Sequence, residues 1–187
     1  MKRLNRMKKI LVVLLFVLTF NSCEETDNSV PDYSMTAQIN GMSWSADKDN
    51  EVAQLDYNYD ANAHFLWIRS QTFNPLPNGI RYQIDIYVFK PVSIGKFYFN
   101  YNGVEMNAIG GVNGWKKNSI DDYFIGHSIN GFVEITDLTR NDISGVFEFT
   151  AVTEKTSSDL GNDTIFIADG KFYVPIIVTG KEWYGPK

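Results

Sequence analysis

Polar side chains at alternating positions from Asp56 to Asn62 are the first group in this sequence that could do chemistry. Their spacing is that of the oxygen ligands in a calcium-binding loop, but such a loop also needs glycine at its sixth position and a bidentate glutamate at its twelfth. This chain has Ala61 and Trp67 at those positions. The segment is therefore better explained as the polar tip of a β-hairpin that joins a strand at 52–57 to a strand at 64–70. The sequence predicts no metal site and no cofactor.

The groups that usually carry catalysis are sparse. His64 and His127 are the only imidazoles, and no serine stands in a Gly-x-Ser-x-Gly motif. With 22 acidic residues, any fold brings some pair of carboxylates to a distance that suits a glycosidase, so that pattern is unspecific. The sequence predicts no catalytic residue and a protein that is not an enzyme. The alternative, a catalytic group that only the fold assembles, stays open.

A glycine-rich segment at residues 110–117, GGVNGWKK, contains the candidate binding residues. It lacks the Gly-x-x-x-x-Gly-Lys-Ser/Thr order of a phosphate-binding loop. As part of a loop at 110–122, it would present Trp115 to solvent beside Lys116 and Asn118. Sugar-binding modules use such a tryptophan, because its face stacks on the apolar face of a pyranose while nearby amides bond the hydroxyls. Alternatively, Trp115 folds back as a lid on the core, since tryptophan is highly buried on average.

The elements that must position these residues are β-strands, because apolar side chains recur with a period of two. In the segment Ile80–Val88, the even-numbered positions are apolar and predict a side that faces the core. The odd positions Arg81, Gln83 and Asp85 predict a side that faces water. Similar alternation recurs along the chain, whereas no amphipathic helical window of ten residues is found outside the N-terminal segment.

Three residues in the alternating segments carry a further expectation. Trp44 and Trp67 are expected in the core. Pro175 interrupts the last such segment, and because proline donates no backbone hydrogen bond, it predicts a strand at a sheet edge.

The turn residues favour an all-β fold. Dipeptides that accept positive φ at both positions stand between alternating runs and predict tight hairpins. They are Asn40-Gly41, Asn102-Gly103, Asn130-Gly131 and Asp169-Gly170. The pattern predicts an antiparallel, hairpin-rich β-sandwich of about twelve strands, in which loops at 71–78 and 110–122 carry the chain between sheets. A lipocalin-like β-barrel is the alternative, since hairpin succession alone does not separate the two.

The N-terminal segment predicts export. Lys8 and Lys9 precede an apolar run of 11 residues, Ile10–Phe20, which is too short for a helix that spans a bilayer of about 30 Å. Cys23, the only cysteine, follows this run. Removing residues 1–22 takes away five basic and no acidic side chains, leaving 12 basic against 22 acidic and a net charge of −10. Such a surface repels phosphate polyanions, so nucleic acid is not an expected partner.

Residues 8–27 resemble the signal of bacterial lipoproteins, with Ser22 directly before Cys23. The resemblance implies a signal peptide at 1–22 and a lipidated Cys23. The polar, acidic residues that follow predict a tether to residue 32, and the remaining length fits a single β domain at 33–187. The acidic residues after the cysteine look like the signal that sends Bacteroidota lipoproteins to the outside of the outer membrane; they are Glu24, Glu25 and Asp27. The alternatives are the periplasmic face, or an ordinary secretory signal cut near Ser22.

A second resemblance covers both ends of the mature domain. The segments 35–44, 131–136, 143–151 and 167–174 are similar to a family of uncharacterised Bacteroidota lipoproteins. The resemblance implies a fold and an envelope location, and no functional residues. We therefore expect a membrane-anchored, non-catalytic module that binds or presents a glycan or a protein. The alternatives are an envelope assembly subunit that pairs through a sheet edge such as that of Pro175, and a lipocalin-like carrier of a small apolar ligand.

Overall fold

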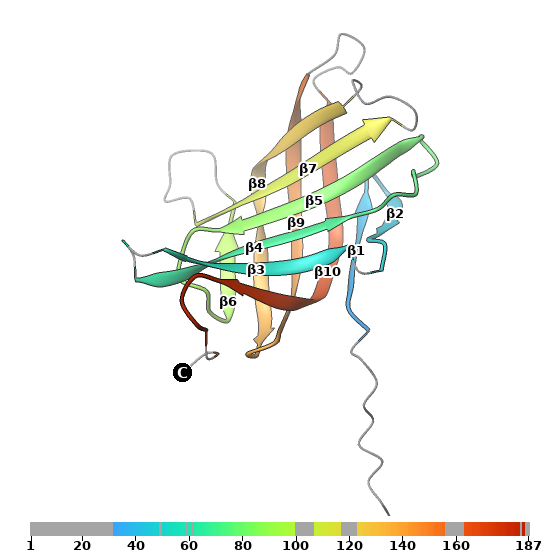
Figure 1. Cartoon of the computed structure of the whole chain (residues 1–187). Helices are drawn as coiled ribbons and strands as arrows, with labels where there is room; N and C mark the ends of the chain where they lie inside the picture. Colours follow the sequence, from blue (N-terminus) through green and yellow to red (C-terminus); the bar gives the residue numbers. More distant parts are fainter. Residues whose placement is uncertain are drawn as a thin grey trace, which may run out of the picture. The chain divides into compact units, whose positions relative to one another are not determined.

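A computed structural model describes most of the chain after residue 31 (Figure 1). The chain divides into two compact units, Met1–Asp32 and Tyr33–Lys187. The predicted lipidation site Cys23, the acidic signal at 24–27 and Asn118 lie outside the described residues. The described residues are 32–48, 50–58, 60, 62–99, 107–116, 123–155, 163–183 and 185.

The described part of the chain contains ten β-strands and no helix, which confirms the all-β prediction. In chain order the strands are β1 (Ser34–Ile39), β2 (Met42–Ser45), β3 (Glu51–Asn58), β4 (Ala63–Gln71), β5 (Ile80–Val88), β6 (Gly95–Tyr98), β7 (Ala108–Lys116), β8 (Tyr123–Leu138), β9 (Asp142–Lys155) and β10 (Thr164–Thr179).

These strands form one large sheet that partly closes on itself. Its order is β2-β1-β10-β3-β4-β5-β7-β8-β6, and β9 pairs with both β8 and β10. The pairings from β10 through β3, β4, β5, β7, β8 and β9 therefore return to β10. Neighbouring strands are antiparallel except β3 and β10, which pair in parallel. Figure 1 shows β3, β4 and β5 running across the direction of β9, whereas β8 and β10 bend so that one end of β8 lies along β7 and one end of β10 lies along β3.

Two of the expected hairpins are present. Asn40-Gly41 joins β1 to β2 with φ of 50° and 77°, as a tight turn of this type requires. β3 and β4 form an antiparallel hairpin that closes where Asn58 pairs with Ala63, and Asp56 and Asn58 of the polar segment lie at the end of β3. The hairpin explanation of the calcium-like spacing is thus confirmed.

Two other predicted turns are wrong. Asn130-Gly131 lies inside β8 directly after a register shift against β9 between Ser128 and Asn130, and Asp169-Gly170 lies inside β10 at a register shift between Ile167 and Gly170. Such β-bulges can also place a residue at positive φ: Gly131 has φ of 122° and Asp169 has φ of 50°. Because the chain continues straight through them, β8 and β10 are each 16 residues long. Long strands replace some of the roughly twelve expected short ones; Asn102-Gly103 lies outside the described residues.

The predicted loop at 110–122 is also wrong over its first part, because residues 108–116 form β7 between β5 and β8. The inward positions of β7 include Gly110 and Gly114, and their lack of side chains leaves space for the rings of Phe149 and Phe124. A Cβ at Gly110 would lie 3.1 Å from the Phe149 ring. These glycines therefore serve packing. The connection at 72–79 joins the paired neighbours β4 and β5, so it does not carry the chain to another sheet.

Pro175 does not mark an edge. On one side of β10, Pro175 pairs with Asp142 of β9. On the other side, β10 pairs with β1 up to Tyr173 and with β3 from Ile176 onward, so Pro175 lies between these two pairings. Its missing N–H thus coincides with a gap between two neighbouring strands. The described strands with a single neighbour are β2 and β6.

The core lies on the inner face of the sheet and confirms the even-numbered face of β5. Tyr82, Ile84 and Ile86 are buried, as is Trp44 of β2. The opposite face of β5 differs from the prediction, because Gln83 and Asp85 are 9% and 6% exposed instead of facing water.

Candidate binding site on the outer face of the sheet

The outer face of β4, β5 and β7 aligns polar and aromatic side chains in rows across the strands. Inward positions of these strands carry the core, so the alternate positions point to the other side. Direct pairing places residues of neighbouring strands in one row. The rows are Trp67, Tyr87 and Ile109; Arg69, Asp85 and Gly111; Gln71, Gln83 and Asn113; and Arg81 and Trp115 with Tyr123 of β8. We call these residues the outer-face site.

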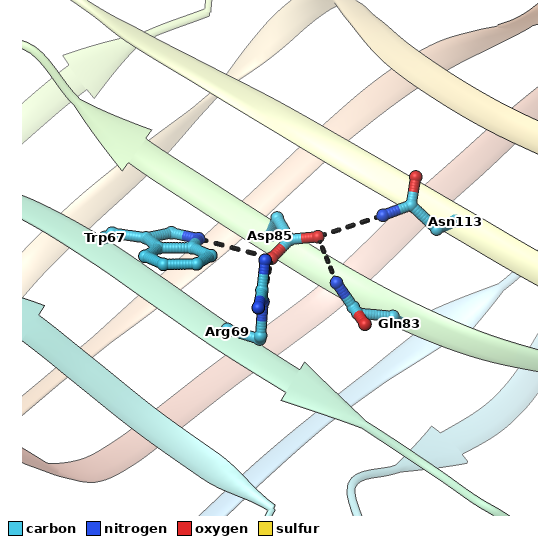
Figure 2. A network of polar contacts seen from close by, with 5 residues as sticks. All are labelled: Trp67, Arg69, Gln83, Asp85 and Asn113. Atoms are coloured by element: carbon cyan, nitrogen blue, oxygen red, sulfur yellow. Dashed lines mark hydrogen bonds and ion pairs between the residues drawn. The ribbon is translucent and has the colours of Figure 1, made fainter.

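The carboxylate of Asp85 lies at the centre of the site (Figure 2). Its Oδ1 accepts hydrogen bonds from Trp67 Nε1 at 3.2 Å and from Arg69 Nε at 2.9 Å. Its Oδ2 accepts from Gln83 Nε2 at 2.6 Å and from Asn113 Nδ2 at 3.0 Å. The four donors come from three neighbouring strands, so one carboxylate fixes the position of all of them.

These contacts decide what Asp85 can do. A carboxylate offers about four acceptor positions, and here each oxygen already accepts two hydrogen bonds. The side chain of Asp85 is 8% exposed, whereas that of its ion-pair partner Arg69 is 45% exposed. Asp85 is therefore a buried hub beneath the covering side chains, and the groups that a ligand could reach are those that it orients.

Aromatic rings form one end of the site. Trp67 and Tyr87 stack with ring centroids 5.2 Å apart and an interplanar angle of 10°. The guanidinium of Arg69 lies over Trp67, with Cζ 3.9 Å from the ring centroid. Burial, followed by the negative charge of Asp85, raises the pKa of Tyr87, so its hydroxyl remains protonated at neutral pH. At this end the Trp67 indole packs against both the Tyr87 ring and the Arg69 guanidinium, and the Tyr87 ring is the more exposed of the two aromatic side chains.

Trp115 lies in the row at the other end. It is half-buried on β7, opposite Arg81 and Tyr123, and so it is neither the tip of an exposed loop nor a lid on the core. Lys116 is the last residue of β7 and is also half-buried. The fold therefore places Trp115 on the same face as the Asp85 hub.

Sequence reasoning missed most of the outer-face site. Trp67 was expected in the core but is half-buried on the outer face, where its indole N–H bonds to Asp85. Gln83 and Asp85 were expected in water. The signal that could have found them is the occurrence of aromatic and amide side chains at the outward positions of three consecutive strands, but its use requires the register of those strands.

The two histidines do not form a site together. His64 is buried at the start of β4, where Nε2 lies 2.8 Å from the carbonyl oxygen of Lys181 and the ring lies between those of Tyr57 and Trp183. These residues border a cleft of about 710 Å³. His127 is exposed on β8. Within the described ranges, no three His, Cys, Asp or Glu side chains gather as metal ligands.

The fold and this site define an all-β domain with a buried carboxylate hub under an aromatic and polar outer face. Comparison with known proteins adds no relative, since no protein-family model, curated protein or solved structure matches the chain. In the part of the chain that the structure describes, no helix has the length and apolar character needed to cross a membrane.

Proposed function

We propose that this chain is a lipid-anchored outer-membrane lipoprotein whose β domain is a non-catalytic binding module for glycans. The observation that carries the proposal is the outer-face site, where aromatic rings at both ends enclose amide and guanidinium groups held by Asp85. Sugars have apolar faces and many hydroxyls, so they match a surface of flat rings with fixed donors and acceptors between them. Preorganised groups favour binding, because little side-chain entropy is lost.

A catalytic role for the same residues is less well supported. A general acid or base must exchange a proton with the substrate, and a nucleophile must reach it. Asp85 is the buried carboxylate of the site, yet all its acceptor positions are taken by side chains of the chain itself. The site is arranged to hold a ligand, and we propose no reaction for it.

The fold also bears on the alternative of an apolar-ligand carrier. We infer that the ring of strands is a flattened barrel rather than a sandwich of two separate sheets, because its pairings return to β10. Its inner face carries large, fully buried side chains that include Phe99, Phe147 and Leu66. Side chains that fill the interior leave less room for a carried ligand, which favours binding on the outside.

An envelope assembly subunit that pairs through a sheet edge has less support. Pro175, the residue expected at such an edge, lies inside the sheet. The described strands with one neighbour, β2 and β6, have four residues each. Short edge strands are a common protection against pairing with other chains. A protein partner that bound the outer face, rather than a sheet edge, would compete with the glycan for the outer-face site.

Substitution of the two outer-face tryptophans tests the binding proposal. Full-length protein in detergent would be screened against immobilised polysaccharides, and the affinity of Trp67→Ala and Trp115→Ala measured for each polymer that binds. We expect at least about tenfold weaker binding from each, because loss of a central aromatic contact commonly costs more than about 1.4 kcal/mol. Phe166→Ala is the control, since Phe166 is an exposed aromatic residue of β10. Equal affinity of all variants, with intact folds, would refute the site.

Protease shaving of intact cells tests the anchor. Lipidation of Cys23 would hold the domain at the membrane, since each buried methylene of an acyl chain contributes about 0.8 kcal/mol. We expect protease to remove the domain from intact wild-type cells and Cys23→Ala protein to be lost from the membrane fraction. Protection of the wild type until the outer membrane is broken would instead place the domain in the periplasm and contradict the export role of Glu24, Glu25 and Asp27.

A further inference from the structure

Arginine is concentrated on the outer-face site. The chain has five arginines, and only Arg69, Arg81 and Arg140 follow residue 22. Two of these three lie in the rows of β4, β5 and β7, although residues 23–187 have a net charge of −10. The acidic partner on the same face, Asp85, lies beneath the surface. Within the rows of the site the accessible charge is therefore positive, while the exposed Asp56 of the neighbouring strand β3 places a negative charge near Tyr87.

Arg69 is held in place with most of its donors left over. Its Nε donates to Asp85 and its guanidinium plane lies over Trp67, while 45% of the side chain is exposed. A guanidinium has five N–H donors in a planar fork that suits a carboxylate, and its hydrogen bonds to Asp85 and to the Tyr87 hydroxyl use part of them. Arg69 can thus bind a second carboxylate, from a ligand, without leaving the first.

Arg81 supplies a second cation at the other end of the site. It is half-buried opposite Trp115, and its Nε is buried without a hydrogen-bond partner in the described part of the chain. A buried donor without a partner costs free energy, so Arg81 is a cation of the site whose hydrogen-bonding capacity the described residues do not fill. Arg81 lies four residues along β5 from Asp85, the residue that pairs with Arg69. At the rise per residue of an antiparallel strand, the backbone positions of Arg81 and Asp85 are roughly 14 Å apart.

From this arrangement we propose that the ligand is an acidic polysaccharide, in which carboxylates on separate sugars bind Arg69 and Arg81 while the sugar rings stack on the aromatic residues. The proposal rests on the glycan-binding function proposed above and specifies its ligand class. A distance of about 14 Å exceeds one sugar ring, so a polymer with repeated acid groups fits better than a single sugar. An acidic peptide would satisfy the arginines but would make less use of the flat rings at both ends.

The test compares polymers that differ only in charge. Binding of full-length protein to polygalacturonate and to alginate would be measured against the same polymers with methyl-esterified carboxyls. We expect the acidic form of at least one polymer to bind about tenfold or more tightly than its ester, and its binding to weaken with added salt. Arg81→Gln should reduce this difference, because glutamine keeps hydrogen-bond donors but loses the charge, so the acidic form should lose more affinity than the ester. Arg140→Gln, in the turn between β8 and β9, should leave both affinities unchanged. Arg69→Gln is the second variant, and its fold is checked because it loses the bond to Asp85.

The outcomes separate the ligand class from the general function. Equal affinity for acid and ester forms, or for neutral galactan and glucan only, would overturn the acidic ligand and leave glycan binding in place. Tighter binding of polyglutamate than of any polysaccharide, lost in Arg81→Gln, would overturn both in favour of an acidic peptide. No binding to any of these polymers would overturn both as well. Acid-selective binding that depends on Arg81 would support both.

Discussion

Replacing Asp85 with asparagine is expected to lower the free energy of unfolding by about 2–4 kcal/mol, although the two side chains have nearly the same shape. The new amide group would face either Trp67 and Arg69 or Gln83 and Asn113, all of which donate to Asp85. A donor would then meet donors, and a buried group left without an acceptor costs about 1–3 kcal/mol. The expected loss corresponds to two donors left without an acceptor, reduced in part because the surrounding side chains can move. Urea denaturation monitored by circular dichroism measures it.

Asp169→Asn is the matched control for this substitution. Asp169 is exposed at the bulge of β10, has φ of 50° and accepts one hydrogen bond from Gln38. Asparagine tolerates that φ, so we expect a change below about 0.5 kcal/mol. Asp85→Asn should also weaken glycan binding, because the donors around the hub lose their common acceptor. An Asp85→Asn protein as stable as Asp169→Asn would show that the hub does not organise the outer face.

Gly131→Ala is expected to be more damaging still, with a loss of about 3–5 kcal/mol from a strained φ and from overpacking. Gly131 has φ of 122°, and an added Cβ would meet the carbonyl oxygen of Glu148 and lie 2.5 Å from Cα of Phe149. Both neighbours are backbone atoms of β9, so relief requires the paired strands to separate. A domain of this size is stable by about 5–15 kcal/mol, and much of the protein should be recovered in aggregates.

Gly111→Ala provides the comparison. Its Cβ would meet its nearest neighbour at 3.7 Å, which is ordinary contact, and its φ is not positive. We expect stability equal to the wild type or slightly higher, because alanine costs less entropy than glycine in a strand. Soluble yield and the urea midpoint of the two alanine variants compare them directly. A Gly131→Ala protein within about 1 kcal/mol of the wild type would contradict the bulge geometry.

Local sequence patterns predicted the kind of element better than its extent. The alternation in Ile80–Val88 identified a strand and its core face correctly. Asn130-Gly131 and Asp169-Gly170 were taken as turns because turns and bulges share the demand for positive φ. What separates them is the strand that lies opposite, here β9, and no local pattern reports a partner so distant in sequence.

The candidate site shows the same limit at the level of side chains. Trp115 was singled out from its type and neighbours, but those glycine neighbours suggested a loop, whereas they make room for rings that approach from β8 and β9. The odd positions of β5 read as solvent-facing because they are polar. Their burial depends on Trp67, Arg69 and Asn113, which reach Asp85 from two neighbouring strands only once the register is set.

Ligand protection of the tryptophans tests the central claim, binding at the outer face, most directly. Full-length protein would be oxidised briefly at tryptophan with and without a saturating glycan that binds in the screen, and each of the four tryptophans quantified by mass spectrometry. We expect the glycan to protect Trp67 and Trp115. Trp44, which is buried on the inner face, and Trp183, which packs against His64, should react equally in both samples. Unchanged oxidation of Trp67 and Trp115 under saturation, or protection of Trp183 alone, would contradict the account.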